Sequence, residues 1–335
     1  HRMQFQQKLM IQTQENGQLH YTKENLYYWF NNLTKKLFVI SRDREDLQVL
    51  INRRYSINAS ESEYDYIVND MIRECQTSGE LTEIHRLAHF EPERGLYIFN
   101  HESEIYKLDG INPPQLVPNG TDGVLFLGSS SHTPFTYQEN TPTGYVDRFL
   151  VETVNFDGEG SNLDERDQAA VFRIWLQSLF FSSIQKTKPI QCFIGEKGSG
   201  KSYNQKRIGM FLFGDRFSVN TLEAGREDDF IAAVTNAAYC AFDNADSYIS
   251  WLPDRLATLA TGGKIERRKL YTDNELATYH PNCFVSINAR TPNFKRDDVM
   301  DRLLPFKVKR YDFFVGESDL YSNGGFLPDP EGVRA

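Results

Sequence analysis

One eight-residue stretch of the chain matches a phosphate-binding motif without a mismatch. The motif is G-x-x-x-x-G-K-[ST], and the residues that fill it are Gly195-Glu196-Lys197-Gly198-Ser199-Gly200-Lys201-Ser202. The apolar run 190–194 comes directly before it and is predicted to be a buried strand, and a helix is predicted from Lys201 to about Leu212. Glycines in such a loop let backbone N–H groups converge on a phosphate. The sequence therefore predicts a site for a nucleoside triphosphate.

The side chains at the end of this motif have separate chemical tasks. Lys201 is expected to reach the β- and γ-phosphates, and the Ser202 hydroxyl is expected to bind Mg²⁺, with the helix N-terminus facing the phosphates. Tyr203 follows directly and completes the expected set of nucleotide contacts. A Gly- and Ser-rich turn that matches by chance is the alternative, but the predicted strand and helix on either side favour phosphate binding.

A phosphate loop identifies a ligand and leaves the reaction open, so the residues downstream must decide between reactions. The apolar run 238–243 is predicted to be a strand that ends in Asp243, whose carboxylate would hold Mg²⁺ directly or through water. An Asp that closes an ordinary Asx-turn is the alternative. The next residue is Asn244, whose amide can orient water but cannot accept its proton. Either Asp246 or Glu266 supplies the base, or hydrolysis is slow.

A third apolar run, residues 282–288, is predicted to be a strand that ends in Asn288. An amide at that place can hydrogen-bond both the γ-phosphate and the attacking water, so it can report whether the γ-phosphate is present. Polar residues also end strands for reasons unrelated to function. The order of loop, acid strand and amide strand favours the functional interpretation.

Two arginines, Arg296 and Arg302, follow the amide strand. They suit an arginine finger that acts in trans and stabilises charge on the γ-phosphoryl group of a neighbouring subunit, which requires an oligomer. The alternative is a solvated helix in which these arginines pair with Asp297, Asp298 and Asp301.

A basic segment lies between the acid strand and the amide strand and follows a glycine pair at residues 262–263. It holds four basic residues within six positions, namely Lys264, Arg267, Arg268 and Lys269. We expect this segment to contact a nucleic-acid backbone, with Tyr271 available for base stacking. Two alternatives stay open: the segment is an ordinary solvated charged face, or Arg268 reaches the phosphates of a neighbouring subunit.

Composition restricts the class of protein. The chain has 335 residues, of which 40% are hydrophobic, and a net charge of -9, so it is globular and any contact with nucleic acid must be local. No apolar run approaches the ~20 residues that cross a bilayer. The first residues lack the layout of a signal peptide, and Cys192, Cys240 and Cys283 lie in apolar runs typical of a buried core. A cytoplasmic protein without membrane contact is expected.

The fold class predicted is α/β, with a three-layer P-loop core built on a parallel sheet and preceded by a smaller helical and β-rich region. Helical spacing occurs at residues 25–37 and 62–73, short β-like runs at 96–99, 105–108 and 124–127, and a further helix is predicted over 164–184. The predicted parts are a helical subdomain at 1–80, a β-rich linker module at 81–160, the ATPase core at 161–312 and an irregular tail at 313–335.

Taken in order, these motifs resemble those of superfamily 3 helicases, within the wider AAA+ class, over about residues 165–310. The similarity is to the ATPase part of phage, plasmid and mobile-element replication proteins of the primase-helicase type. The stretch 296–303 also resembles the arginine-bearing element of bacterial enhancer-binding ATPases, and 96–108 is similar to the linker module of primase-helicases. The resemblance implies ATP and Mg²⁺ as cofactors, a hexameric ring around single-stranded DNA with the segment near Lys264 lining its pore, and a primase or other replication protein as partner. Asn244 departs from this pattern, because most ring-forming ATPases place a glutamate there.

Three functions are therefore compared. The first is an ATP-driven oligomeric DNA motor. The second is an ATP-dependent assembly switch, such as a loader or a transposition or defence component, which hydrolyses slowly and unwinds nothing, and Asn244 is its main support. The third is a monomeric nucleoside or small-molecule kinase, which leaves the basic segment and the late arginines unexplained.

Overall fold

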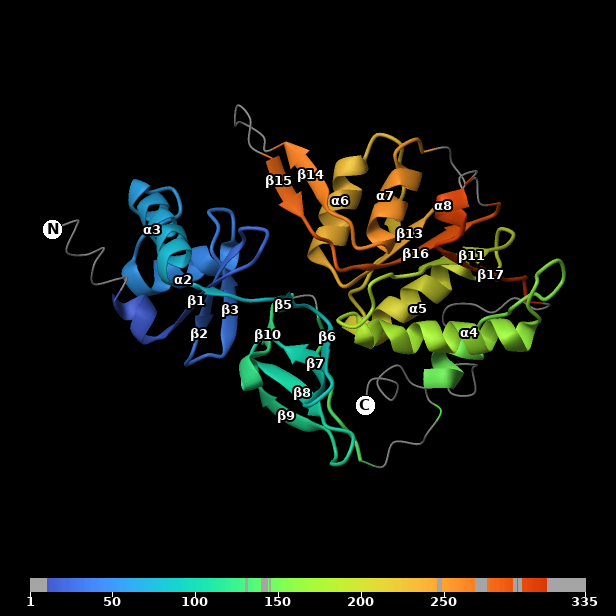
Figure 1. The fold of residues 1–335 in the computed structure, drawn as a ribbon, viewed down its shortest axis with the longest axis horizontal. Coiled ribbons are helices and arrows are strands. Elements are labelled where there is room, and N and C mark those ends of the chain that lie inside the picture. The colour runs from blue at the N-terminus through green and yellow to red at the C-terminus, as the bar shows by residue number, and fades with distance from the viewer. Residues whose placement is uncertain are drawn as a thin grey trace. The chain divides into compact units, whose positions relative to one another are not determined.

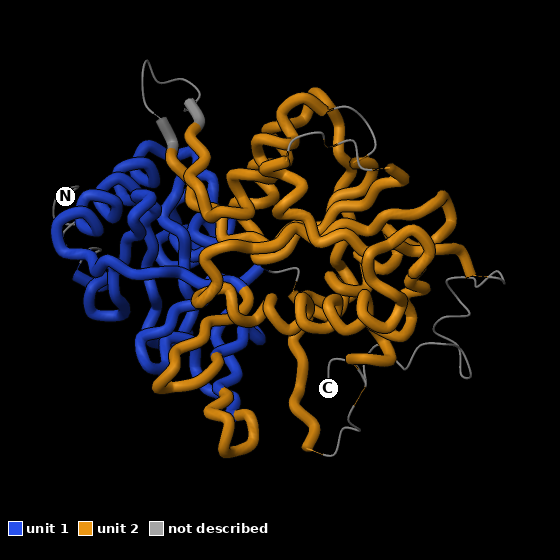
Figure 2. Tube along the Cα trace, turned by 45° about the vertical axis from the view of Figure 1, so that its right-hand side comes forward, with its two compact units in different colours: residues 1–86, 97–107, 115–130 blue, residues 87–96, 108–114, 131–335 orange. Residues whose placement is uncertain are grey.

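The computed structural model describes residues 11–129, 132–139, 144, 146–245, 249–268, 276–291, 294 and 297–311. The chain divides into two compact units (Figure 2). The first holds residues 1–86, 97–107 and 115–130, and the second holds residues 87–96, 108–114 and 131–335.

The first unit begins with a four-stranded sheet and two helices. The strands are β1 (Gly17–Tyr21), β2 (Tyr27–Asn31), β3 (Lys36–Val39) and β4 (Glu80–Leu81), in the order β3-β2-β1-β4. The helices are α2 (Glu45–Tyr55) and α3 (Ser62–Ser78). A core of buried side chains from both helices and the sheet includes Leu19, Trp29, Phe38, Leu47 and Val68. The helical subdomain expected at residues 1–80 therefore contains a sheet as well as helices.

The helix predicted over 25–37 is wrong, because this stretch forms the β2–β3 hairpin. The Asn31 Oδ1 atom accepts hydrogen bonds from the backbone N–H groups of Leu33 (2.9 Å) and Thr34 (3.1 Å), and Lys35 has a φ of 57°. An Asn side chain that bonds its own following backbone forms a tight turn and stops a helix. The helix predicted over 62–73 is confirmed by α3.

The β-rich stretch expected after residue 81 is present. It contains β5 (Ile84–His85), β6 (Ala88–Glu91), β7 (Gly95–His101), β8 (Glu104–Leu108), β9 (Gln115–Pro118), the short helix η1 (Thr121–Gly123) and β10 (Leu125–Phe126). Strands β6 to β9 form one sheet in chain order, and β5 pairs with β10. The predicted β-like runs at 96–99, 105–108 and 124–127 therefore correspond to β7, β8 and β10.

The second unit is built on a five-stranded sheet, and its strands are parallel, as the sequence predicted. Its strands are β11 (Ile190–Ile194), β12 (Asn220–Thr221), β13 (Tyr239–Asp243), β16 (Phe284–Ala289) and β17 (Leu303–Lys307). They lie in the order β12-β13-β16-β11-β17, and every neighbouring pair is parallel. Because β16 lies between β11 and β13, the carboxyl ends of these three strands are adjacent at one edge of the sheet.

Helices cover both faces of this sheet (Figure 1). The helices α4 (Glu165–Ser178) and α5 (Lys201–Phe213) lie on one face, and α6 (Glu227–Asn236) and α7 (Leu252–Ala260) lie on the other. The other helices and strands described between residues 131 and 311 are η2 (Asp147–Val151), η3 (Leu179–Phe181), β14 (Ile265–Arg268), β15 (Leu276–Tyr279) and α8 (Asp297–Met300). The predicted helix over 164–184 is α4 continued by η3, and the Asp164 carboxylate caps its start by accepting from the Asp167 N–H at 2.8 Å.

The two faces of the sheet differ in composition. The face under α6 and α7 packs into an apolar cluster that includes Phe230, Val234, Phe242, Leu256 and Ile287. The face under α4 holds close aromatic contacts among Phe156, Phe172, Trp175, Phe193 and Phe306. The face under α5 also holds buried polar side chains, described below.

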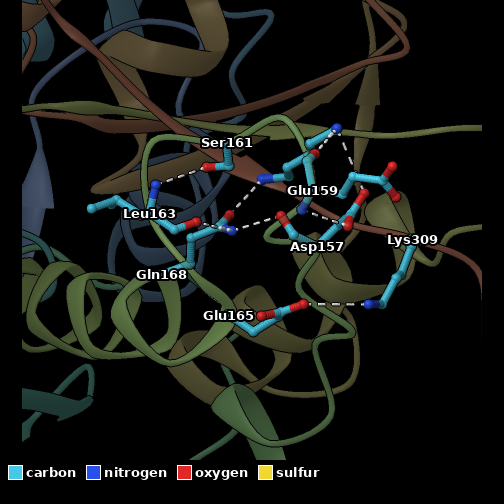
Figure 3. Close-up of polar contacts among 8 residues, drawn as sticks. Asp157, Glu159, Ser161, Leu163, Glu165, Gln168 and Lys309 are labelled. Carbon is cyan, nitrogen blue, oxygen red and sulfur yellow. Dashed lines mark hydrogen bonds and ion pairs between the residues drawn. The ribbon is translucent and has the colours of Figure 1, made fainter.

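A segment before α4 is fastened to the end of β17 (Figure 3). The Gln168 side chain hydrogen-bonds the backbone groups of three residues. Its Oε1 accepts from the Lys307 N–H at 2.8 Å, and its Nε2 donates to the carbonyls of Asp157 (2.8 Å) and Leu163 (3.2 Å). Glu165 pairs with Lys309 at 3.4 Å in the same network. This network fixes the carboxyl end of β17, which borders the phosphate loop.

Cys192, Cys240 and Cys283 are buried, as expected for core residues. Cys75 is buried as well, and burial raises the pKa of its thiol to about 12. Within the ranges that the structure describes, no helix combines the length and the apolar character needed to cross a membrane.

Candidate nucleotide-binding site

The phosphate loop connects β11 to α5, as its motif requires, and its glycines have separate structural reasons. At Gly195 an added Cβ would lie 2.1 Å from the Val308 carbonyl oxygen, so only glycine fits beside the end of β17. Gly200, directly before α5, has a φ of 80°, a conformation that glycine adopts readily. Between them, Ser199 is buried and its hydroxyl donates to the Glu196 carbonyl at 2.8 Å. The loop is therefore held in shape by its own side chains and by β17.

The Lys201 ammonium lies against the carbonyls of its own loop. Its Nζ atom donates to the carbonyl oxygens of Gly195 at 2.7 Å and Glu196 at 2.8 Å. An ammonium has three donors and no acceptor, so it can turn from these neutral carbonyls to a phosphate without changing protonation state. The Lys201 ammonium therefore lies at the phosphate loop, as the sequence predicted.

Three polar residues that lie far apart in the sequence meet beside this loop. The Ser202 Oγ donates to Asp243 Oδ2 at 2.6 Å, and Asn288 Nδ2 donates to Ser202 Oγ at 3.2 Å. Asp243 is the last residue of β13, and Asn288 lies near the end of β16. The structure therefore brings together the loop serine, the acid and the amide that the sequence singled out separately.

This arrangement suits a magnesium ion. A hydroxyl and a carboxylate oxygen at hydrogen-bond distance are hard ligands, and Mg²⁺ at nucleotide sites takes one or two protein oxygens and completes its shell with phosphates and water. Over the described part of the chain, no group of three His, Cys, Asp or Glu side chains forms a denser metal cluster. Ser202 and Asp243 are accordingly the residues that would hold the ion.

Asn244 is exposed and has a φ of 66°. Its backbone N–H donates to Asp243 Oδ1 at 2.7 Å and to Asn288 Oδ1 at 3.3 Å. Of the two acids expected to replace it as a base, Asp246 lies outside the described residues. The Glu266 carboxylate pairs with Lys264 Nζ at 2.6 Å in the β14–β15 hairpin.

Arg302 lies at the opposite edge of the sheet from the loop. Its carbonyl accepts from the N–H of Ile190, the first residue of β11, at 2.9 Å, whereas the loop begins after Ile194 at the other end of that strand. With a rise of about 3.3 Å per residue, the length of β11 separates Arg302 from its own loop. Its guanidinium contacts the carbonyl of Asp298 and lies 3.7 Å from the Asp298 carboxylate. Arg296 lies outside the described residues.

The basic segment forms part of a hairpin. Strands β14 and β15 pair antiparallel, with Ile265 opposite Tyr279 and Arg268 opposite Leu276, and the hairpin projects from the parallel-sheet core (Figure 1). The Lys264 side chain is 59% exposed. Arg267 and Arg268 belong to β14, while Lys269 and Tyr271 lie outside the described residues.

Three observations concern residues that the sequence either placed differently or did not single out. Tyr203 is half-buried, and its ring lies 5.7 Å from the Arg207 guanidinium, so in this structure it packs along α5. Arg310 Nε donates to the Lys197 carbonyl at 2.6 Å, which places a cation at the phosphate loop from beyond β17. Gln205 donates hydrogen bonds to both β13 and β16. Its spacing of three residues from Ser202 on one helix was the only signal in the sequence.

Comparisons with known proteins extend only to the fold. No protein-family model matches the chain, and no curated protein matches it in sequence. Among solved structures, the apo C-terminal region of NrS-1 aligns over 96% of this chain with 13% identity and a TM-score of 0.51, and a second form aligns over 97% with the same identity and score. A structure described as an active helicase, SCCmec type IV Cch, aligns over 94% with 15% identity and a TM-score of 0.42. The chain spans 66%, 67% and 55% of these three chains. The likeness to the NrS-1 region shows a shared fold.

Proposed function

We propose that this protein is an ATP hydrolase that assembles into an oligomer, a hexameric ring. It moves along single-stranded DNA in the manner of a phage or mobile-element replicative helicase. The observation that carries the proposal is the convergence of Ser202, Asp243 and Asn288 beside a complete phosphate loop. That set supplies a lysine for the phosphates, ligands for Mg²⁺ and an amide for the γ-phosphate. The likeness in fold to the C-terminal region of NrS-1 is compatible with it.

The chemistry assigned to the site residues follows from their positions. Lys201 and the loop N–H groups bind the β- and γ-phosphates, Ser202 and Asp243 hold Mg²⁺, and Asn288 orients the attacking water. When bound, the metal neutralises charge on the phosphates. We assign this ATPase core to residues 161–312.

An oligomer is part of the proposal because of Arg302. This arginine lies at the sheet edge away from its own loop, so it has no route to the γ-phosphate of its own subunit. A neighbouring subunit's nucleotide gives its guanidinium a target, and we propose the same for Arg296. The contact to Asp298 is a partly exposed pair, which costs little to break.

DNA contact is proposed for the β14–β15 hairpin and the basic residues at 264–269. Lys264 is 59% exposed where it leads into β14, and the segment that follows adds three more basic residues on an acidic chain, so it offers phosphates a local site. With one hairpin from each subunit, such contacts would line a shared axis.

The test is the effect of single-stranded DNA on ATP turnover. We expect DNA to stimulate the wild-type ATPase, and a Lys264→Ala/Lys269→Ala double variant to lose that stimulation while its basal turnover persists. The matched control is Lys23→Ala/Lys186→Ala, which removes the same charge from two exposed lysines elsewhere. If DNA neither binds to the wild-type protein nor changes its turnover, the motor proposal is wrong.

A second function is favoured by one observation. Asn244 stands next to the magnesium-binding acid, and its neutral amide cannot take a proton from water. An ATP-dependent assembly switch with slow hydrolysis needs no such base. Mass photometry with and without ATP, combined with the ATPase assay with and without DNA, separates the two functions. ATP-driven oligomerisation with turnover that DNA does not change supports the switch, and DNA-stimulated turnover supports the motor.

A further inference from the structure

A line of buried polar side chains leads from the candidate site into the sheet. Gln191, Gln205 and Ser286 are each 0% exposed, and Asn288 is 1% exposed. Gln191 and Ser286 are directly paired positions on β11 and β16, and Asn288 follows Ser286 by two residues, so their side chains share one face. Buried amides and hydroxyls are costly unless they are hydrogen-bonded, so their mutual bonds decide what they contribute.

Gln205 is the member of this line that connects α5 to the strands β13 and β16. It lies on α5, one turn beyond Lys201, and faces the strands. Its Nε2 donates to the Ser286 hydroxyl at 2.9 Å and to the Phe242 carbonyl on β13 at 3.3 Å. Its Oε1 accepts from Asn288 Nδ2 at 2.8 Å. Both donor hydrogens and the acceptor of this amide are therefore engaged.

These bonds dictate which way the Asn288 amide points. Its Nδ2 has one hydrogen on Gln205 Oε1 and the other directed at Ser202 Oγ, 3.2 Å away, so its Oδ1 must face the backbone N–H of Asn244. If the amide turned over, its carbonyl oxygen would meet the Gln205 oxygen and its NH₂ group would meet another N–H donor. Gln205 therefore excludes the reversed orientation.

The two bonds from Asn288 Nδ2 differ in what a bound nucleotide does to them. The bond to Ser202 is the longer one, and Ser202 is the residue assigned to Mg²⁺. If that hydroxyl bound the ion, one N–H of Asn288 would become available to the γ-phosphate. The other N–H stays on Gln205, which is fixed by Ser286 and Phe242.

We propose that Gln205 is a positioning residue for ATP hydrolysis, which holds the Asn288 amide with one N–H available to the γ-phosphate. This inference rests on the proposed ATPase function and adds a residue that acts through Asn288. It predicts that Gln205 affects turnover and the discrimination of ATP from ADP rather than overall nucleotide affinity.

The experiment compares Gln205→Met with Gln191→Met. Both substitutions replace a fully buried glutamine of the same line by an unbranched side chain of similar length, but only the first touches Asn288. We expect Gln205→Met to lower kcat about tenfold, because an Asn288 amide that is no longer oriented would lose its hydrogen bond to the γ-phosphate. Its KM for ATP should stay within about twofold, because the loop and Lys201 are unchanged. Gln191→Met should keep the wild-type kcat.

A binding measurement adds a readout that general destabilisation does not change. Competition of ATP and ADP against a fluorescent ATP analogue gives the affinity ratio of the two nucleotides. We expect Gln205→Met to reduce the preference for ATP and Gln191→Met to retain it. Equal effects of the two variants on kcat and on this ratio, or no effect of Gln205→Met on either, would overturn the inference.

A double variant tests the positioning role of Gln205 even if Gln205→Met alone folds poorly. In an Asn288→Ala background Gln205 has nothing left to orient, so Gln205→Met should cost no further turnover there, whereas an additive loss contradicts the positioning role. Wild-type protein that fails to bind or hydrolyse ATP would instead overturn the proposed function itself. Wild-type turnover with an unaffected Gln205→Met overturns this inference alone.

Discussion

The two faces of the parallel sheet use the same strands for different purposes. Under α6 and α7, side chains of β11, β13 and β16 form an apolar cluster that includes Cys192, Phe242 and Ile287. Under α5, the alternate residues of the same strands include Gln191 and Ser286, and their line continues to the site at the strand ends. Because strand side chains alternate between faces, one backbone can carry both surfaces.

The difference indicates that the apolar face mainly stabilises the fold, whereas the polar face mainly orients side chains at the candidate site. Apolar burial contributes in proportion to area and requires no particular orientation. Buried amides contribute little net stability but fix geometry, since each donor demands one acceptor in one place. The aromatic contacts of α4 with β11 and β17 stabilise the polar face from the side. Substitutions on the two faces should therefore separate stability from turnover.

The largest effect is expected on the apolar face. Leu256 of α7 is 0% exposed, so Leu256→Ala should lower the free energy of unfolding by about 2–5 kcal/mol through lost transfer energy and a cavity. Below its unfolding transition the variant should retain wild-type kcat. Ile174→Ala on α4, where the side chain is 65% exposed, is the control and should change stability by less than about 0.5 kcal/mol. Denaturant unfolding and ATPase assays measure both quantities, and a comparable loss of kcat in folded Leu256→Ala would remove the proposed division.

The polar face should give the converse result at the strand end. Asp243→Asn keeps an oxygen that can accept from Ser202 but removes the charge that would hold Mg²⁺. We expect kcat to fall at least about a hundredfold, or ~2.7 kcal/mol in the activation barrier, with little change in unfolding. Asp229→Asn, at an exposed position on α6, is the matched control. Turnover of Asp243→Asn that equals the control, at saturating Mg²⁺, would remove Asp243 from the catalytic set.

The sequence predicted the parts of this site whose signals are local. The phosphate loop is a contiguous motif, and Asp243 and Asn288 each end an apolar run, so the parallel sheet alone implies that they meet. Gln205 gave no comparable signal, because a buried glutamine in a helix has the same local pattern as an exposed one. Arg310 was missed for a related reason: its contact to Lys197 depends on where β17 ends.

The main error in the predicted fold is the helix over 25–37, where the hydrogen bonds of a turn outweigh the helical spacing of the apolar residues. Aromatic residues three and four apart in 25–37 are typical of a helix, but they occupy neighbouring positions of a hairpin whose turn is set by Asn31. Both faces of β2 are buried, so its side chains show no alternation between polar and apolar that would indicate a strand. Periodicity therefore fails where a strand is covered on two sides.

The smallest effect concerns a buried polar group of the first unit, outside the candidate nucleotide-binding site. His20 on β1 is 3% exposed; its Nδ1 lies 2.8 Å from the Thr82 hydroxyl and 3.9 Å from the Glu80 carboxylate. Burial lowers the pKa of His20 below its usual 6.5, and the Glu80 charge opposes this only in part. The folded state thus binds fewer protons than the unfolded state as the pH falls through 6.5. The contribution of neutral His20 to stability is complete above that pH and is lost progressively as the pH falls toward the lower folded-state pKa.

Hydrogen exchange of peptides from β1 to β3 at pH 8 and pH 5 measures this effect within the first unit. We expect protection of these strands to decrease at pH 5, after correction for the intrinsic exchange rate, while the strands of the parallel sheet change less. His20→Gln keeps a polar group of similar size but does not titrate, so the pH-dependent part should disappear in this variant. If the wild-type protein and His20→Gln lose the same protection between the two pH values, His20 is not the group responsible. A buried polar side chain then lowers stability in acid only where it can change its charge, which the amides beside the nucleotide site cannot do.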